Sequence, residues 1–281
     1  PAPRVDHHGR MTTTPPPQTP PSHALRARSF NAAAAQYAAH RPSYPPALFD
    51  AVEELAGRSL TGATVVDVGA GTGISTALLH DRGADVLAVE PGEGMAAEFR
   101  RRLPHIPIVR GNGNALPVAD AHADFVTYAQ AWHWTDTTRS VPEVLRVLRP
   151  GGALALWWNT EALDVDWIGE AADRKGRLLG VDFAAKKRSA RGSTDLADPS
   201  GRLDFVREEV RWSRRVPVDT HLANVGSHSD FLVMPEDRRA AFLEEERARL
   251  LEVFADGIVE ETYDVLLLIA LAPAPTRSPT P

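Results

Sequence analysis

One short stretch of the sequence combines an acidic residue with three glycines at alternate positions. Asp67 stands near the end of a valine-rich segment, and Gly69, Gly71 and Gly73 follow it. Glycine at these positions lets the backbone turn tightly and lets a ligand approach without obstruction by Cβ atoms. The residues after Gly73 have a helical pattern, and the first N–H groups of a helix are available to a polar ligand. The stretch therefore predicts a binding site for a nucleotide-type cofactor.

A second acidic residue indicates that the ligand contains a nucleoside. Glu90 lies 23 residues after Asp67, at the end of the next extended segment. A carboxylate there can accept two hydrogen bonds from the ribose hydroxyls of an adenosine. Nicotinamide enzymes place an acid similarly, but their G-x-G-x-x-G fingerprint requires glycine where this chain has Ile74. A nicotinamide-dependent oxidoreductase is therefore kept as an alternative.

Several segments resemble the class I S-adenosylmethionine-dependent methyltransferases. The D-x-G-x-G-x-G pattern that begins at Asp67 matches the first motif of that family. The residues from 111 to 117 resemble its G-D-A-x-x-L-P loop, with Asn114 in place of the acid. The residues from 143 to 152, which end in Leu-Arg-Pro-Gly-Gly, resemble the helix and turn after its fourth strand.

An N-terminal segment resembles one branch of this family. Its pattern Y-x-x-x-R-P-x-Y-P begins at Tyr37. It is similar to the small-molecule branch that includes methyltransferase type 11 and trans-aconitate methyltransferase-like proteins. The resemblance covers roughly residues 24–158 strongly and the remainder only by topology.

The resemblance implies S-adenosylmethionine as the cofactor and assigns residues to parts of it. Tyr37 would cap the methionine end, and Arg41 would pair with its carboxylate. Met95 would stack against the adenine, and the Asn114 carbonyl would accept a hydrogen bond from the adenine amino group. The implied cofactor-binding residues are Tyr37, Arg41, Asp67, Gly69, Ala70, Gly71, Gly73, Glu90, Pro91, Met95, Asn114, Ala115, Leu116, Gln130 and Ala131.

The candidate catalytic residue is a histidine. His133 follows the fourth predicted strand, so we expect it at the mouth of the site, where it could act as a general base for a hydroxyl nucleophile. The alternative is an imidazole packed between Trp132 and Trp134 for structural reasons. His221 and His228 are weaker candidates, and some methyltransferases need no base.

The methyl acceptor is expected to be a small hydrophobic or aromatic molecule. Aromatic residues surround the expected pocket, and an apolar, aromatic-lined cavity suits a planar ligand. The candidate acceptor-binding residues are Trp132, Trp134, Trp158 and Phe231. By analogy with the branch, we expect methylation of oxygen rather than nitrogen or carbon, in secondary metabolism. A protein that binds S-adenosylmethionine but catalyses a non-methylating rearrangement is a further alternative.

The elements that must position these residues alternate between extended and helical patterns. This alternation predicts an α/β fold, a doubly wound and mostly parallel seven-stranded sheet. The predicted strands are residues 63–68, 84–90, 106–110, 124–130, 153–158, 205–216 and 259–271. We expect one domain at 24–272, with helical lid insertions at about 160–203 and 217–256. The proline-rich tails at 1–23 and 273–281 are predicted to be disordered.

Composition excludes several other classes of protein. The chain has no cysteine, which rules out disulfides and thiolate metal sites, and we expect no metal. Its net charge of −6 and lack of a basic stripe argue against a nucleic-acid partner. The longest apolar run, Val265 to Ala272, is too short to span a membrane. We expect a cytoplasmic monomer or homodimer whose partner is a small-molecule acceptor.

Overall fold

The computed structural model describes residue 30 and residues 34–185 and 197–273. Apart from Pro273, the predicted tails at 1–23 and 273–281 lie outside these residues. Within them, each helix is too short or too polar to cross a bilayer.

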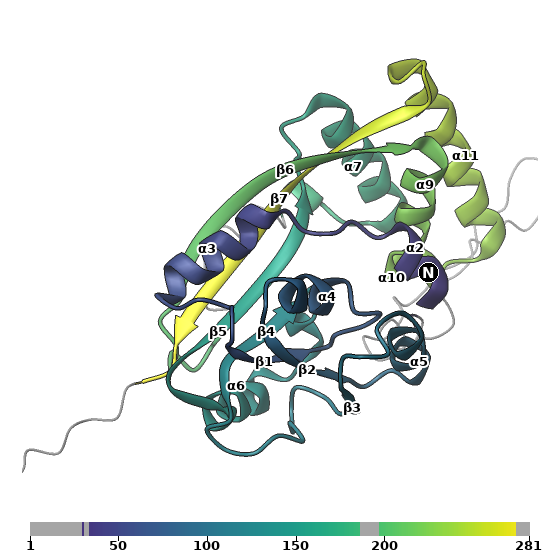
Figure 1. Ribbon diagram of the computed structural model, residues 1–281. Coiled ribbons are helices and arrows are strands. Elements are labelled where there is room, and N and C mark those ends of the chain that lie inside the picture. The colour runs from purple at the N-terminus through teal and green to yellow at the C-terminus, as the bar shows by residue number, and fades with distance from the viewer. Residues whose placement is uncertain (1–29, 31–33, 186–196, 274–281) are drawn as a thin grey trace, which may run out of the picture.

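A seven-stranded sheet forms the centre of the fold, in the order β3-β2-β1-β4-β5-β7-β6 (Figure 1). Strand β7 is antiparallel to its neighbours β5 and β6, and the other neighbouring pairs are parallel. The strands are β1 (Thr64–Val68), β2 (Asp85–Glu90), β3 (Ile108–Arg110), β4 (Ala123–Ala129), β5 (Leu148–Glu161), β6 (Val206–Pro217) and β7 (Ile258–Leu271). The predicted fold class, a doubly wound and mostly parallel seven-stranded sheet, is confirmed.

Helices cover both faces of the sheet because side chains of successive strand residues point to opposite sides. Val65 packs with α3 (Pro46–Ala56), α4 (Ile74–Asp81) and α5 (Glu93–Arg102) on one face. Its neighbour Val66 packs with α6 (Thr137–Val147) on the other. Both valines are fully buried, which explains why the strand is apolar at successive positions.

Strand β5 is longer than the sequence pattern predicts. It was expected at residues 153–158, but it begins at Leu148, directly after α6, and continues to Glu161. Its pairing with β4 ends at Trp157, whereas its pairing with β7 continues to the contact of Glu161 with Tyr263. The strand therefore extends past the edge where β1 and β4 end and carries polar residues beyond it.

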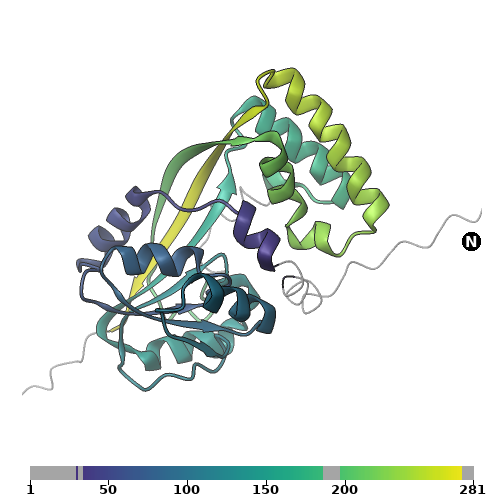
Figure 2. The same cartoon turned by 45° about the vertical axis from the view of Figure 1, so that its right-hand side comes forward.

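A helical layer stands on the extended ends of β5, β6 and β7 (Figures 1 and 2). Its own small core joins Val218 and Leu222 to Leu250 and Val259. The short helix α2 (Ala34–His40) lies against this layer, where Gln36 Nε2 donates to the Ala223 carbonyl at 3.4 Å. The helices of the layer are α7 (Asp166–Leu179), α9 (Val218–Gly226), α10 (Ser229–Leu232) and α11 (Glu236–Val253). They fall within the segments predicted as insertions and face the carboxyl ends of the strands.

Candidate active site

The turn after β1 requires glycine at each alternate position. Gly69, Gly71 and Gly73 have φ angles of 70°, 58° and 89°, which other residues rarely adopt. A Cβ atom on Gly69 would lie 2.5 Å from the Cβ of Ala131, and one on Gly73 would lie 2.5 Å from Leu103 Cδ1. The turn is therefore packed closely from both sides, and its backbone lies against the loop that follows β4.

Asp67 supports this turn from within the core. Its carboxylate accepts hydrogen bonds from Thr76 Oγ1 at 2.6 Å and from Thr127 Oγ1 at 2.8 Å. These bonds tie β1 to the first turns of α4 and to β4. Burial raises the pKa of Asp67 to about 6, although the two hydrogen bonds act in the opposite direction. The side chain is 1% exposed and does not line the cavity described below. Asp67 therefore holds the strands and helix around the turn together and does not face the cavity.

Glu90 stands at the end of β2 and faces the same turn. Its Oε2 accepts from the backbone N–H of Gly71 at 2.8 Å, and its Oε1 accepts from that of Gly92 at 2.6 Å. Burial raises the pKa of Glu90, while the two backbone N–H groups lower it in part. A carboxylate offers about four lone-pair sites, so two can still accept hydroxyl groups from a ligand.

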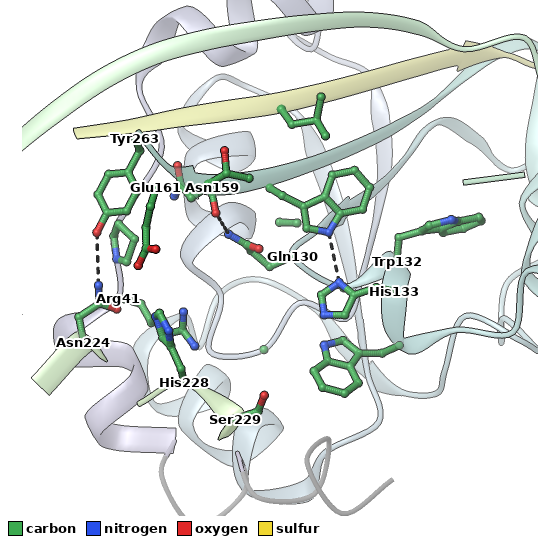
Figure 3. Close-up of a pocket in the computed structure, with 18 of the residues that line it drawn as sticks. Arg41, Gln130, Trp132, His133, Asn159, Glu161, Asn224, His228, Ser229 and Tyr263 are labelled. Carbon is green, nitrogen blue, oxygen red and sulfur yellow. Dashed lines mark hydrogen bonds between the residues drawn. The ribbon is translucent and has the colours of Figure 1, made fainter. Parts of the chain in front are cut away.

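A cavity of about 1110 Å³ lies between the carboxyl ends of the strands and the helical layer (Figure 3). It begins at Glu90 and the glycine turn and extends to Glu161 and Tyr263. It brings together most of the residues singled out from the sequence. These are Tyr37, Arg41, Gly69, Gly71, Glu90, Pro91, Met95, Asn114, Gln130, Ala131, Trp132, His133, Trp134 and Trp158.

Several other predicted residues do not line this cavity. Ala70 faces only an adjoining small pocket. Gly73 is the residue before α4 and is enclosed by Leu103 and Phe99. Ala115 is exposed, whereas Leu116 is buried. Gly73, Ala115 and Leu116 therefore lie beside the cavity and do not line it.

The adjoining pocket joins Arg41, which was predicted at the cofactor site, to two hydroxyl residues that sequence reasoning missed. Its volume is about 40 Å³, and its walls include Arg41, Thr72 and Ser75. Arg41 Nε, Thr72 Oγ1 and Ser75 Oγ are buried and make no hydrogen bond within the described part of the chain. All three can donate, and they lie beside the N-terminus of α4, which favours negative charge. The pocket therefore suits a small anionic group such as a carboxylate.

Asn114 lines the cavity, and its side chain already makes one hydrogen bond within the protein. Its Oδ1 accepts from the backbone N–H of Asp136 at 2.9 Å. A carbonyl oxygen has a second lone pair, so the predicted hydrogen bond from an adenine amino group is still available.

His133 is held between two indole rings. Trp158 Nε1 donates to His133 Nδ1 at 3.2 Å, and the ring of Trp134 lies 4.8 Å from the imidazole (Figure 3). A neutral imidazole carries one proton, so this hydrogen bond places it on Nε2. In this form His133 Nε2 is a donor and cannot accept a proton. The predicted role as a base would require Nδ1 to exchange its bond to Trp158.

Two of the predicted acceptor-binding residues are anchored in the protein. Trp132 forms part of the cavity wall but is 2% exposed, and its Nε1 donates to the Ala197 carbonyl at 2.9 Å. Phe231 is fully buried against Phe242, with ring centroids 5.4 Å apart, and does not line the cavity. The prediction for Phe231 therefore needs correction: its side chain packs inside the helical layer.

Comparison with known proteins identifies the family. A family model described as a methyltransferase domain matches residues 66–156. An uncharacterized methyltransferase of Mycobacterium tuberculosis is 36% identical over 222 residues, which cover 79% of this chain and 85% of that protein. The chain belongs to the class I S-adenosylmethionine-dependent methyltransferases.

Two further matches cover part of the sequence or the fold alone. A demethylmenaquinone methyltransferase of Beutenbergia cavernae is 41% identical over 96 residues, which cover 34% of this chain and 40% of that protein. A solved structure assigned as a type II methyltransferase from Anaeromyxobacter dehalogenans has a TM-score of 0.62 and 23% identity. It covers 83% of this chain and 99% of that chain, and at this identity it shows a shared fold.

Family membership decides between the two cofactor classes considered from the sequence. This methyltransferase is an S-adenosylmethionine-dependent enzyme, and the nicotinamide oxidoreductase alternative is overturned. Among the residues that the structure describes, no group of three or more histidine and acidic side chains is arranged to hold a metal.

The methyltransferase also has functional candidates that carried no local signal in the sequence. Asn159 and Glu161 lie on the extension of β5, Tyr263 on β7 and Asn224 on α9, and all four line the cavity (Figure 3). They come together only because long strands pair and a helix folds back on them. Thr72 and Ser75 could have been noticed, since hydroxyl residues beside a glycine turn commonly bind polar ligands.

Proposed function

We propose that this enzyme transfers a methyl group from S-adenosylmethionine to a small hydrophobic or aromatic metabolite, with oxygen as the favoured acceptor atom and secondary metabolism as the setting. The observation that carries the proposal is the continuity of the cavity. One end holds the glycine turn and Glu90, and the other is lined by aromatic side chains beneath the helical layer. A donor and an acceptor could therefore occupy one continuous cavity.

The residues of the first end suit the methyl donor. Glu90 has acceptor sites for the two ribose hydroxyls, and Met95 lines the cavity next to Gly71, with its Cε 3.5 Å from a Cβ built there. We assign the methionine carboxylate to the small pocket, where Arg41, Thr72 and Ser75 offer donors. The cation of Arg41 lies 4.6 Å from the centre of the Tyr37 ring, which supports the predicted position of Tyr37 at the methionine end.

The aromatic end suits a planar acceptor. Trp134, Trp158, Trp167 and Phe183 line it, and such side chains bind planar apolar molecules through large flat surfaces. A partial match to a protein named as a demethylmenaquinone methyltransferase is compatible with this assignment.

Catalysis would depend mainly on orientation. S-adenosylmethionine held by Glu90 and the glycine turn would supply an activated methyl group. The carbon–sulfur bond would break as the bond to the acceptor oxygen formed, and the hydroxyl proton of the acceptor would pass to solvent water. Holding the two reactants in line can supply about 7–11 kcal/mol of the barrier. In the tautomer favoured by Trp158, His133 Nε2 carries a proton, so the ring would act as a donor rather than as a base.

Donor binding can be tested by calorimetric titration of S-adenosylmethionine. We expect binding to the wild-type protein and a loss of affinity of about tenfold or more for Glu90→Gln, because a buried hydrogen-bonding site is left incompletely matched. Glu93→Gln is the matched control, since Glu93 is exposed and does not line the cavity. Equal affinities for the two variants would contradict the assignment of Glu90.

Methyl transfer is tested by measuring S-adenosylhomocysteine. Incubation with a panel of phenols, anilines and aromatic acids should yield S-adenosylhomocysteine in proportion to methylated product. Conversion of an acceptor without S-adenosylhomocysteine would instead support the rearrangement alternative.

A further inference from the structure

Polar side chains lie beside the aromatic ones at the end of the cavity nearest the helical layer, and they hold one another in fixed orientations (Figure 3). They come from β7 and α9, far from the glycine turn in sequence. The inference drawn from them deepens the proposed function and rests on it, because it concerns the acceptor that the cavity would bind.

The orientation begins at a buried carboxylate. Glu261 is 2% exposed and accepts hydrogen bonds from Arg214 Nε and from His221 Nδ1, the latter at 2.7 Å. Burial alone would raise the pKa of Glu261, but the hydrogen bonds from His221 and Arg214 outweigh it and lower the pKa. Glu261 is therefore ionised at neutral pH and acts only as an acceptor.

Glu261 in turn orients Tyr263. The Tyr263 hydroxyl donates to Glu261 Oε2 at 2.9 Å. Burial raises the pKa of Tyr263 well above its usual value, and the charge of Glu261 adds to the effect, so the phenol keeps its proton. Because that proton is used toward Glu261, the phenolic oxygen can only accept from other neighbours.

Tyr263 then decides which way the Asn224 amide faces. Asn224 Nδ2 donates to the Tyr263 oxygen at 3.3 Å (Figure 3). The side chain of Asn224 is 4% exposed and lines the cavity, and its Oδ1 is buried without a hydrogen-bond partner in the described part of the chain. A buried carbonyl oxygen that receives no hydrogen bond is unfavourable, so a ligand that donates to it would bind preferentially.

The charges around this end largely compensate one another. Lys175 Nζ pairs with Glu161 at 2.6 Å, and Glu246 pairs with Arg174 at 2.6 Å. His228 is held neutral, because burial and then the charges of Arg41 and Lys175 move its pKa well below the ordinary value. With Arg41 engaged by the carboxylate of the methyl donor, as assigned above, a charged ligand group would lose its hydration here without gaining an uncompensated partner.

We propose that Asn224 is a specificity-determining residue that selects acceptors with an uncharged hydrogen-bond donor, such as a hydroxyl, at this end of the molecule. Carboxylates and ethers at the same position would be disfavoured. The carboxylates would lose their hydration, and the ethers would leave Asn224 Oδ1 unmatched. This argues against polycarboxylate acceptors, although the N-terminal pattern resembles the trans-aconitate branch.

The test uses three probes of similar shape, titrated calorimetrically into the protein saturated with S-adenosylhomocysteine. The probes are 2-naphthol, 2-methoxynaphthalene and 2-naphthoate at neutral pH. We expect the wild-type protein to bind 2-naphthol about fivefold to tenfold more tightly than either other probe. In Asn224→Leu, which keeps the shape of the side chain but removes both its oxygen and its nitrogen, the preference over the ether should disappear.

A second variant separates this role from a general effect on folding. Tyr263→Phe keeps the ring but removes the hydroxyl that orients the amide, so Asn224 can rotate and present Nδ2. We therefore expect the preference for 2-naphthol over the ether to fall while the variant still binds S-adenosylhomocysteine, which shows that it is folded.

Three results would overturn the proposal. The first is an unchanged naphthol-to-ether ratio in Asn224→Leu, and the second is wild-type binding of the naphthol no tighter than of the ether or the carboxylate, including no binding at all. The third is a loss of S-adenosylhomocysteine affinity in Asn224→Leu, which would place Asn224 at the methyl donor. Failure of the wild-type protein to bind S-adenosylhomocysteine would instead refute the proposed function itself.

Discussion

The two acidic residues near the glycine turn have different tasks because they face different surroundings. Glu90 lines the cavity and accepts backbone N–H groups from the turn. Asp67 is enclosed by the core and accepts only from Thr76 and Thr127 in the described structure. The acidic residue that begins the motif therefore holds the glycine turn in place from the core, and it does not line the cavity itself.

The buried position of Asp67 predicts a dependence of stability on pH. Its pKa is about 6 in the folded protein and about 3.9 when unfolded, so the folded state binds this proton more tightly. Its contribution is fully present below the unfolded pKa and is lost as the pH rises through the folded one. From about pH 4 to about pH 7, we expect the free energy of unfolding of Asp67→Asn to gain up to about 3 kcal/mol relative to wild type.

Urea unfolding at both pH values measures this difference. Asp85→Asn is the control, because Asp85 is an exposed residue at the start of β2. A gap between wild type and Asp67→Asn that does not change with pH would refute the assignment.

His133 gives a second prediction at the scale of a single residue. Because Trp158 donates to Nδ1, we expect the ring to act as a hydrogen-bond donor, so His133→Gln should lower kcat by about fivefold. The shape of the pH–rate profile should not change. A fall of about 10²-fold or more, with loss of the acidic limb of the profile, would instead establish His133 as a general base.

The glycine turn shows how an element can depend on close contact with another segment. Gly69→Ala would place a methyl group 2.5 Å from the Cβ of Ala131, in addition to the strain of a positive φ. We expect a loss of about 2–4 kcal/mol in the free energy of unfolding, since left-handed strain and overpacking each cost about 1–2 kcal/mol or more.

A matched variant isolates the contact from the strain. Gly62 has a similar φ of 74° but nothing within 4 Å of an added Cβ. Gly62→Ala should therefore lose only about 1–2 kcal/mol in chemical denaturation. Equal losses in the two variants would show that the packing against Ala131 is unimportant.

The long strands are the second element on which the site depends. β5 and β7 remain paired beyond the edge where β1 and β4 end, and this pairing sets Glu161 beside Tyr263. Because neighbouring strands share a register, the polar end of the cavity is positioned by the same sheet that positions the glycine turn. The donor and acceptor regions are thus parts of one rigid framework.

At the scale of the whole molecule, donor binding should stabilise the fold. A ligand at about 100 times its dissociation constant adds about 2.7 kcal/mol to the free energy of unfolding. For a chain of this size, this corresponds to a rise in the melting temperature of about 5–10 °C. Thermal unfolding with S-adenosylmethionine tests it. Glu90→Gln should show a smaller rise at the same concentration, and an equal rise in NADH would contradict the specificity.

The sequence by itself determined the fold class and the cofactor family. It could do so because the glycine turn, Glu90 and the turn after α6 can each be recognised in a short local stretch of sequence. Parallel strands then place their carboxyl ends at one edge of the sheet. Strand boundaries were less certain, as β5 shows, since a Pro-Gly-Gly stretch reads as a break although Leu148 already pairs with Ala123.

Only the tertiary structure decided which side chains meet. Phe231 resembled a pocket residue in sequence yet packs within the helical layer, because hydrophobicity alone does not say which face of a helix is covered. Two clusters join distant segments. One is the set of donors in the small pocket, Arg41, Thr72 and Ser75. The other is the chain of hydrogen bonds from Glu261 through Tyr263 to Asn224. Their geometry follows from long-range strand pairing and helix packing, which residue spacing does not encode.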